Sequence, residues 1–271
     1  MVTLQCEQVE AAQPTWQRRA ALVVTHPGHE LFVHAWMEMA RPIVFVLTDA
    51  TDTGMSCLPA TAEVVEQAGG RLGPLLGRCT DAGLGRAVRN SDHQRFVSVA
   101  AELADDLVRE DIDYIVGDAA EGYDLSHDVC RLLIDAAVAQ ASRLRPTLKN
   151  YELLLSAPTV PSPPHLSQRS VRLQLDPEAW ARKYNATFAY PEPPSDIARA
   201  VERFGLDSLQ TECLRPAIPW RLMQPHFTSN YHDSTGGGDR SHPSAMLFRE
   251  RLLPLAEALR VAAASGMARA A

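Results

Sequence analysis

Two histidines follow a short apolar run near the start of the chain. Residues 21–30 read ALVVTHPGHE, so that His26 and His29 lie in a turn that contains Pro27 and Gly28. A continuous apolar run bounded by turn residues is typical of a buried parallel strand, and open α/β sheets bind ligands beyond the carboxyl ends of such strands. Imidazole is the commonest neutral ligand for zinc and similar ions. The pair therefore predicts half of a metal site.

Polar residues take the same position after other apolar runs. The residues expected just beyond strand ends are His26, Asp49, Asp81 and Asp118. A polar loop then leads to His127 at the start of a helix, and His127 is the third predicted ligand. Because the carboxyl ends of parallel strands meet at one edge of a sheet, these side chains are expected to converge. For any single aspartate, capping of the following helix explains the position equally well.

Three polar residues near these ends have two interpretations. Arg78 and Asp81 are candidates for binding substrate hydroxyls, although an ion pair between them explains both residues as well. Glu30 is a candidate acceptor that orients a metal-binding histidine, and the alternative is stabilisation of the amino-terminal end of the following helix. The sequence leaves both pairs of interpretations open.

Strand and helix patterns alternate through the first 150 residues. The expected strands are residues 21–25, 43–47, 72–76 and 113–116, and the expected helices are residues 31–40, 61–68, 92–110 and the segment that begins at His127. Strand, helix and strand within about thirty residues form a βαβ unit with a right-handed crossover. The alternation predicts an α/β fold with a doubly wound, mostly parallel sheet and helices on both faces.

The chain is expected to divide into three parts. Residues 1–156 form the predicted catalytic domain, residues 157–170 a proline-rich linker, and residues 171–271 an extension that packs on the same domain. The extension is expected to contain an edge strand at 171–175, helices at 177–190, 197–204 and 246–260, and a glycine-rich segment at 224–241. That segment is interpreted either as a closing lid or as a disordered loop.

Composition excludes several classes of protein. The 271 residues are 46% hydrophobic and 22% charged, with a net charge of −7, which disfavours a nucleic-acid binder. The five cysteines are scattered without a CxxC pair, and no run approaches the ~20 apolar residues of a membrane span. We expect a cytoplasmic protein with a small-molecule substrate and neither nucleic-acid nor membrane partners. A homo-oligomer is compatible with the sequence.

Two motifs resemble those of a known family. HPGHE at 26–30 is similar to the HPDDE motif of the LmbE/PIG-L family of zinc-dependent N-deacetylases, and DLSHD at 124–128 is similar to its second motif, HPDHD. The resemblance covers most of the first 150 residues and implies a Rossmann-like fold with Zn²⁺, or another divalent metal, at the strand ends. Carried over position by position, the family's ligands fall on His26, on His29 in place of an aspartate, and on His127.

The departures from the family pattern concern proton transfer. The family's general base corresponds to Gly28, and a histidine associated with the oxyanion or the leaving amine corresponds to Asp124. In one interpretation Asp118, Asp124 or Asp49 accepts the proton, and the chain is a metal-dependent hydrolase that removes an N-acyl group from a small polar molecule, such as an amino sugar or natural-product intermediate. In the other it binds a small ligand without hydrolysis or catalyses a different metal-assisted reaction.

Overall fold

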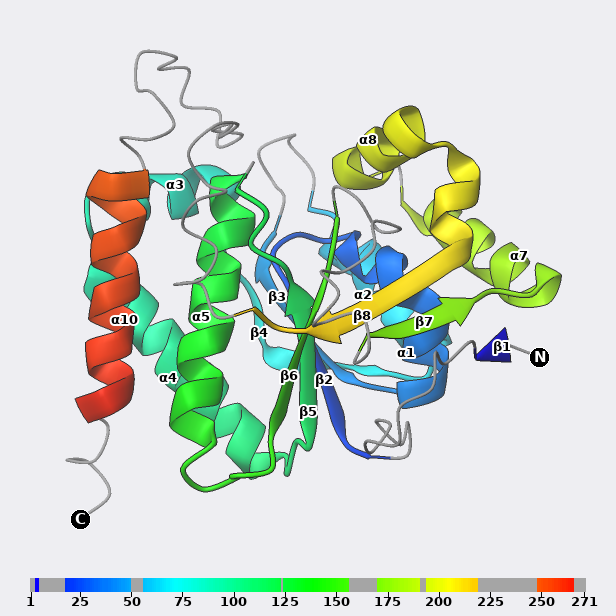
Figure 1. The fold of residues 1–271 in the computed structure, drawn as a ribbon. Helices are drawn as coiled ribbons and strands as arrows, with labels where there is room; N and C mark the ends of the chain where they lie inside the picture. The colour runs from blue at the N-terminus through cyan, green and yellow to red at the C-terminus, as the bar shows by residue number, and fades with distance from the viewer. Residues whose placement is uncertain are drawn as a thin grey trace.

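The strands in the described part of the chain form one mixed sheet (Figure 1). The computed structural model describes residues 3–4, 18–49, 56–122, 124–155, 170–190, 194–218 and 248–265. The strands in these ranges are β1 (Thr3–Leu4), β2 (Ala20–Val24), β3 (Ile43–Thr48), β4 (Arg71–Cys79), β5 (Tyr114–Asp118), β6 (Lys149–Leu153), β7 (Val171–Gln174) and β8 (Thr211–Pro216). Their order across the sheet is β1-β7-β8-β6-β5-β2-β3-β4.

Five neighbouring strands of this sheet are parallel. β2 pairs with β3 on one side and with β5 on the other, β4 continues beyond β3, and β6 continues beyond β5. β8, β7 and β1 then add antiparallel strands beside β6. This arrangement confirms the predicted α/β fold with a mostly parallel sheet.

Helices cover both faces of the sheet. The helical segments are η1 (His29–Val33), α1 (His34–Ala40), α2 (Leu58–Gln67), α3 (Asp81–Arg89), α4 (His93–Arg109), α5 (Leu125–Ala141), α7 (Pro177–Ala186), η3 (Thr187–Ala189), α8 (Ser195–Phe204), η4 (Leu206–Gln210), η6 (Phe248–Leu252) and α10 (Leu253–Ser265). α3, α4 and α5 lie on one side of the sheet, with α10 packed on the outer side of α4 and α5, and η1, α1 and α2 pack on the other face (Figure 1).

Burial on both faces explains the continuous apolar strands. In β2, Ala21 and Val23 contribute to the core on the α4 and α5 side, whereas Leu22 and Val24 contribute to the core on the α1 and α2 side. Successive side chains of a strand point to opposite faces, so a strand buried on both faces needs an apolar residue at every position.

The order of the strands places a topological switch point between β2 and β5. Within the parallel part of the sheet, the chain begins with β2 in the middle, adds β3 and β4 on one side, and then adds β5 and β6 on the other. Connections that leave neighbouring parallel strands in opposite directions open a crevice at their carboxyl ends, where α/β proteins bind ligands. His26 and His29 follow β2, and Asp118 ends β5. These three predicted site residues therefore lie at the switch point.

Several elements differ from the sequence prediction. β4 runs from residue 71 to 79, beyond both ends of the expected strand at 72–76, and β6, β8 and α3 were not predicted. In β6 the apolar pattern is interrupted because buried Glu152 pairs with Arg215 of β8 at 2.6 Å. The expected edge strand lies between β1 and β8 instead of at the edge. Residues 157–169 and 224–241 lie outside the described residues, and the domain boundaries stay a prediction.

Two further features concern the whole described part of the chain. None of its helices combines the length and the apolar character that crossing a bilayer requires. Among the described residues, the cysteines at positions 79, 130 and 213 are in no disulfide.

Candidate metal centre

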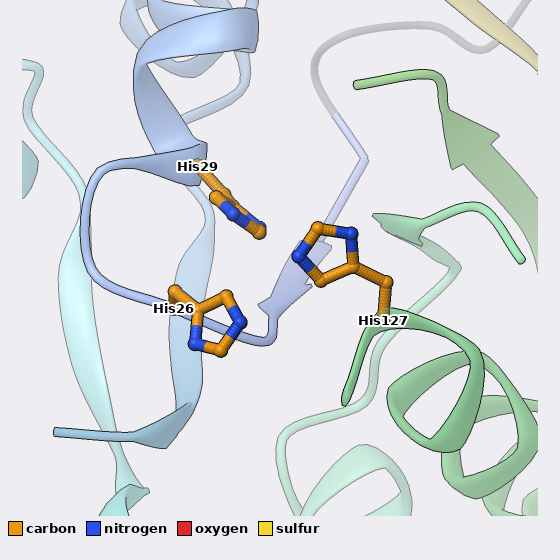
Figure 2. Close-up of side chains that lie close together, drawn as sticks. All are labelled: His26, His29 and His127. Carbon is orange, nitrogen blue, oxygen red and sulfur yellow. The ribbon is translucent and has the colours of Figure 1, made fainter. Parts of the chain in front are cut away.

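Three histidines from two separate segments meet at the switch point. His26 lies in the turn after β2, His29 begins η1, and His127 lies in the first turn of α5. Figure 2 shows their rings facing a common centre, with ring centroids 4.9 to 5.2 Å apart. One nitrogen of each ring lies within 4.8 Å of the others. The three residues that the sequence nominates as metal ligands are thus brought together.

Asp118 holds the ring of His29. Nδ1 of His29 lies 2.8 Å from Oδ2 of Asp118, and the same oxygen accepts the backbone N–H of Thr25 at 2.7 Å. Burial alone would raise the pKa of Asp118, but the charge of His29 and the hydrogen bond to it lower that pKa to about 2. Asp118 is therefore an anionic acceptor that fixes the orientation of the imidazole.

His26 is held in the same way by a hydroxyl and a carboxylate. Its Nδ1 lies 2.8 Å from Oγ1 of Thr48 and 3.0 Å from Oδ1 of Asp81. Burial would raise the pKa of Asp81, but the hydrogen bond and charge of His26 lower it. In both His26 and His29, Nδ1 is engaged by an oxygen of the protein, and Nε2 is the nitrogen on the opposite side of the ring.

A carboxylate that the sequence did not nominate lies against two of the histidines. Asp196, in the first turn of α8, places Oδ2 2.9 Å from Nε2 of His29 and 3.8 Å from Nε2 of His127. Burial would raise the pKa of Asp196, but the hydrogen bond and charge of His29 hold it well below the ordinary value. In the sequence Asp196 is an ordinary acid at a helix start, and no local signal marks it as part of the site.

The electrostatics of the histidines differ. Burial lowers the pKa of His29, but the carboxylates of Asp118 and Asp196 outweigh this effect and hold the pKa well above the ordinary value for histidine. Burial lowers the pKa of His127 to about 4, so this ring is neutral at pH 7. Neutral imidazole is the form that binds a metal.

The turn between His26 and His29 is fixed by buried contacts. Gly28 has φ +100°, and a Cβ on it would lie 2.4 Å from Cγ of Pro194. Oε2 of Glu30 accepts the N–H of Gly28 at 2.8 Å, while its Oε1 accepts the hydroxyl hydrogen of Tyr190. Tyr190 also contacts Oγ1 of Thr61 at 2.9 Å. These bonds of Glu30 brace the backbone that carries the two histidines.

Two of the other nominated residues have partners outside the histidine cluster. Oδ1 of Asp124 caps α5 by accepting the N–H of Ser126 at 2.8 Å. The guanidinium of Arg78 pairs with Glu102 at 2.5 Å, whereas Asp81 pairs with His26, so the ion pair between Arg78 and Asp81 that the sequence allowed is not formed.

Asp49 lies beyond the end of β3. Its backbone N–H donates to the carbonyl of Cys79 in the neighbouring strand β4 at 3.1 Å. Its side chain lies beside Gly77, where an added Cβ would be 3.2 Å from Cβ of Asp49. Asp49 therefore occupies the predicted edge of the sheet.

The donor set fits a zinc ion. Two ligands of tetrahedral zinc at 2.0 to 2.1 Å lie about 3.3 Å apart, and the three nitrogens need to approach one another by no more than about 1.5 Å from their present limit of 4.8 Å. A metal-binding histidine commonly donates its second N–H to a carboxylate or another oxygen, as Nδ1 of His26 and His29 are placed to do. The residues present are therefore suited to holding the metal that the motifs imply.

Three solved structures, of two deacetylases, resemble this chain. The zinc-inhibited form of teicoplanin deacetylase Orf2 has a TM-score of 0.53 at 14% identity, over 73% of this chain and 97% of its own. A40926 pseudoaglycone deacetylase Dbv21 has a TM-score of 0.51 at 15% identity, over 74% and 98%. The deacetylase triple mutant Orf2*T of the teicoplanin biosynthetic pathway has a TM-score of 0.52 at 14% identity, over 73% and 97%. The chain has the fold of these deacetylases.

Two sequence comparisons gave no match. No protein family and no curated protein matches the chain. The likeness to the deacetylases is therefore one of fold, and an argument about activity has to come from the residues of the site.

Proposed function

We propose that the chain is a metal-dependent hydrolase of the LmbE/PIG-L type that removes an N-acyl group from a small polar molecule, such as an amino sugar or a natural-product intermediate. The convergence of His26, His29 and His127 at the switch point of the sheet carries the proposal. These residues come from the two segments that resemble the family's motifs. The shared fold with deacetylases is consistent with it.

The three imidazoles would hold Zn²⁺ or another divalent metal. When bound, such an ion supplies a Lewis acid for the amide carbonyl and lowers the pKa of a water ligand towards 7. The surrounding side chains keep the ligands in place: Asp118 orients His29, and Thr48 and Asp81 orient His26. Ligands that are oriented in advance bind a metal more tightly.

Proton transfer needs a residue other than the one that the family uses. Gly28 offers no carboxylate, and Pro194 fills the space where a side chain would begin. The pKa of about 2 makes Asp118 a weak proton acceptor and favours a positioning role. Asp124 is anchored through Oδ1 beside His127, and its charge acts on the imidazole. We therefore assign the proton-accepting role to Asp124, with Asp49 at the next strand end as the alternative.

One observation favours a second function. Both positions at which the family handles protons have changed, and here one is packed against Pro194 while the other caps α5. A protein that binds an N-acylated ligand in the same crevice without hydrolysing it would need neither group.

The experiment measures release of acid from a panel of N-acetylated and longer N-acylated amino sugars and glycopeptides. We expect zinc-loaded protein to release acid from at least one compound, and a chelator or His26→Ala to abolish the release. His93→Ala, which removes a histidine from α4, serves as the matched control and should retain activity. If no compound releases acid while one of them binds, the hydrolase is refuted and the binding function is favoured.

A further inference from the structure

The carboxylate of Asp196 belongs to the metal centre. We propose that Asp196 is the fourth protein ligand of the metal, so that the centre consists of three imidazoles and one carboxylate. The proposal rests on the metal site of the proposed function, but not on the hydrolytic reaction.

The distances from the Asp196 carboxylate to the histidine nitrogens favour a direct ligand of the metal over a group that acts through a water. Oδ2 of Asp196 lies 2.9 Å from Nε2 of His29 and 3.8 Å from Nε2 of His127. These values lie on either side of the separation of about 3.3 Å expected for two ligands of a tetrahedral zinc ion. A general base acting on a metal-bound water would lie one hydrogen bond further out, at 2.6 to 3.2 Å from that water. Oδ2 is thus at the distance of a ligand.

Packing of α8 holds the carboxylate in this position. Pro194, directly before the helix, lies against Gly28, and Ile197 and Ala200 are buried in the same core as η1, which α8 contacts. The guanidinium of Arg199 bonds to Oδ1 of Asp196. This bond engages one carboxylate oxygen and leaves Oδ2 directed at the histidines. Asp196 itself is only 6% exposed.

The same segment explains the two changes in the first motif. A glycine at position 28 admits Pro194 against the turn, because any side chain there would collide with its ring. His29 replaces the carboxylate that the motif resemblance implies as a ligand, and Asp196 brings a carboxylate back from residues far along the chain. The ligand set then has the one negative charge that an all-histidine set lacks. With four protein ligands, a water or a substrate oxygen would have to bind the metal as a fifth ligand, which zinc sites sometimes allow.

Metal binding by variants at position 196 tests the proposal without an activity assay. Asp196→Asn should weaken Zn²⁺ binding, measured by competition with a chromophoric chelator, by at least the 10-fold to 100-fold that loss of an orienting partner costs. Glu202→Gln is the matched control, because Glu202 lies exposed on the same helix and its loss removes the same charge. The control should bind Zn²⁺ as the unaltered protein does.

A thiolate gives a direct signature of coordination. Asp196→Cys loaded with Co²⁺ should show the near-ultraviolet sulfur-to-cobalt charge-transfer band, and Glu202→Cys should not. Unchanged Zn²⁺ affinity in Asp196→Asn, absence of this band in a folded Asp196→Cys, or failure of the unaltered protein to bind either metal overturns the proposal. If the metal results hold and no acyl group is released, only the hydrolytic function fails.

Discussion

The substitution Gly28→Ala, compared with an alanine at another glycine of positive φ, measures how much the packing of Pro194 against Gly28 contributes to stability. The backbone at Gly28 has φ +100°, and the new Cβ would lie 2.4 Å from Cγ and 2.6 Å from Cβ of Pro194. A residue held at such a φ costs about 1–3 kcal/mol. Overpacking against a rigid ring adds about 1–3 kcal/mol. We therefore expect a total loss of about 2–6 kcal/mol in the free energy of unfolding.

Gly69→Ala provides the matched comparison. Gly69 also has a positive φ, of +78°, but the nearest atom to a new Cβ there is 3.4 Å away and belongs to the flexible side chain of Arg41. The free energy of unfolding of this variant should fall only by the cost of an alanine at positive φ, about 1–3 kcal/mol. Urea unfolding of both metal-free variants gives the two values from the shift in midpoint at constant m-value.

The variants should also differ in metal binding. Gly28→Ala displaces the turn that carries His26 and His29, so its Zn²⁺ affinity should fall, whereas Gly69 lies at the end of α2 and its variant should bind Zn²⁺ normally. Equal stability losses in the two variants, or unchanged Zn²⁺ affinity in Gly28→Ala, would refute the packing of Pro194 against this turn.

Three further predictions follow from buried charges. Asp118→Asn removes the anionic acceptor of His29 and should weaken Zn²⁺ binding about 10-fold to 100-fold in chelator competition; unchanged affinity would contradict its positioning role. The raised pKa of His29 means that the ring is protonated at pH 7 without metal, so Zn²⁺ binding should release about one proton and should strengthen as the pH rises. Calorimetry in buffers of different ionisation enthalpy measures this release, and identical heats in all of them would exclude it. Lys183→Met leaves Glu212 buried without the ammonium that lies 3.0 Å away, and should lower the free energy of unfolding by about 3–5 kcal/mol in urea titration; a loss below about 1 kcal/mol would contradict this.

The sheet could be predicted where the residues carry a strong local pattern. β2, β3 and β5 are apolar on both faces, and the amphipathic pattern of α4 marked the expected helix at 92–110. β6 and β8 could not be predicted in this way, because their polar residues are buried as pairs. Glu152 has no apolar signature, and only its contact with Arg215 makes its burial favourable. Pairs of residues that are far apart in the chain produce no recognisable pattern in a short stretch of sequence.

The site residues also divide into those that the sequence could predict and those that it could not. His26, His29 and His127 each follow a recognisable strand or loop, so their convergence could be expected from the topology of parallel strands. Asp196 could not, because it reaches His29 from 167 residues away through the packing of α8. The packing of Pro194 against Gly28 is equally long-range. The sequence alone indicates that a carboxylate ligand of the family motif is replaced by His29. In the structure, the carboxylate of Asp196 in α8 lies beside that histidine.

The central claim is that three imidazoles bind one metal ion at the switch point of the sheet. Crystals grown with Zn²⁺ and measured on both sides of the zinc absorption edge test it most directly. We expect one strong anomalous peak at 2.0 to 2.1 Å from a nitrogen of each of His26, His29 and His127. A crystal grown with Zn²⁺ that shows no peak between these rings, or shows its zinc bound elsewhere, would contradict the account.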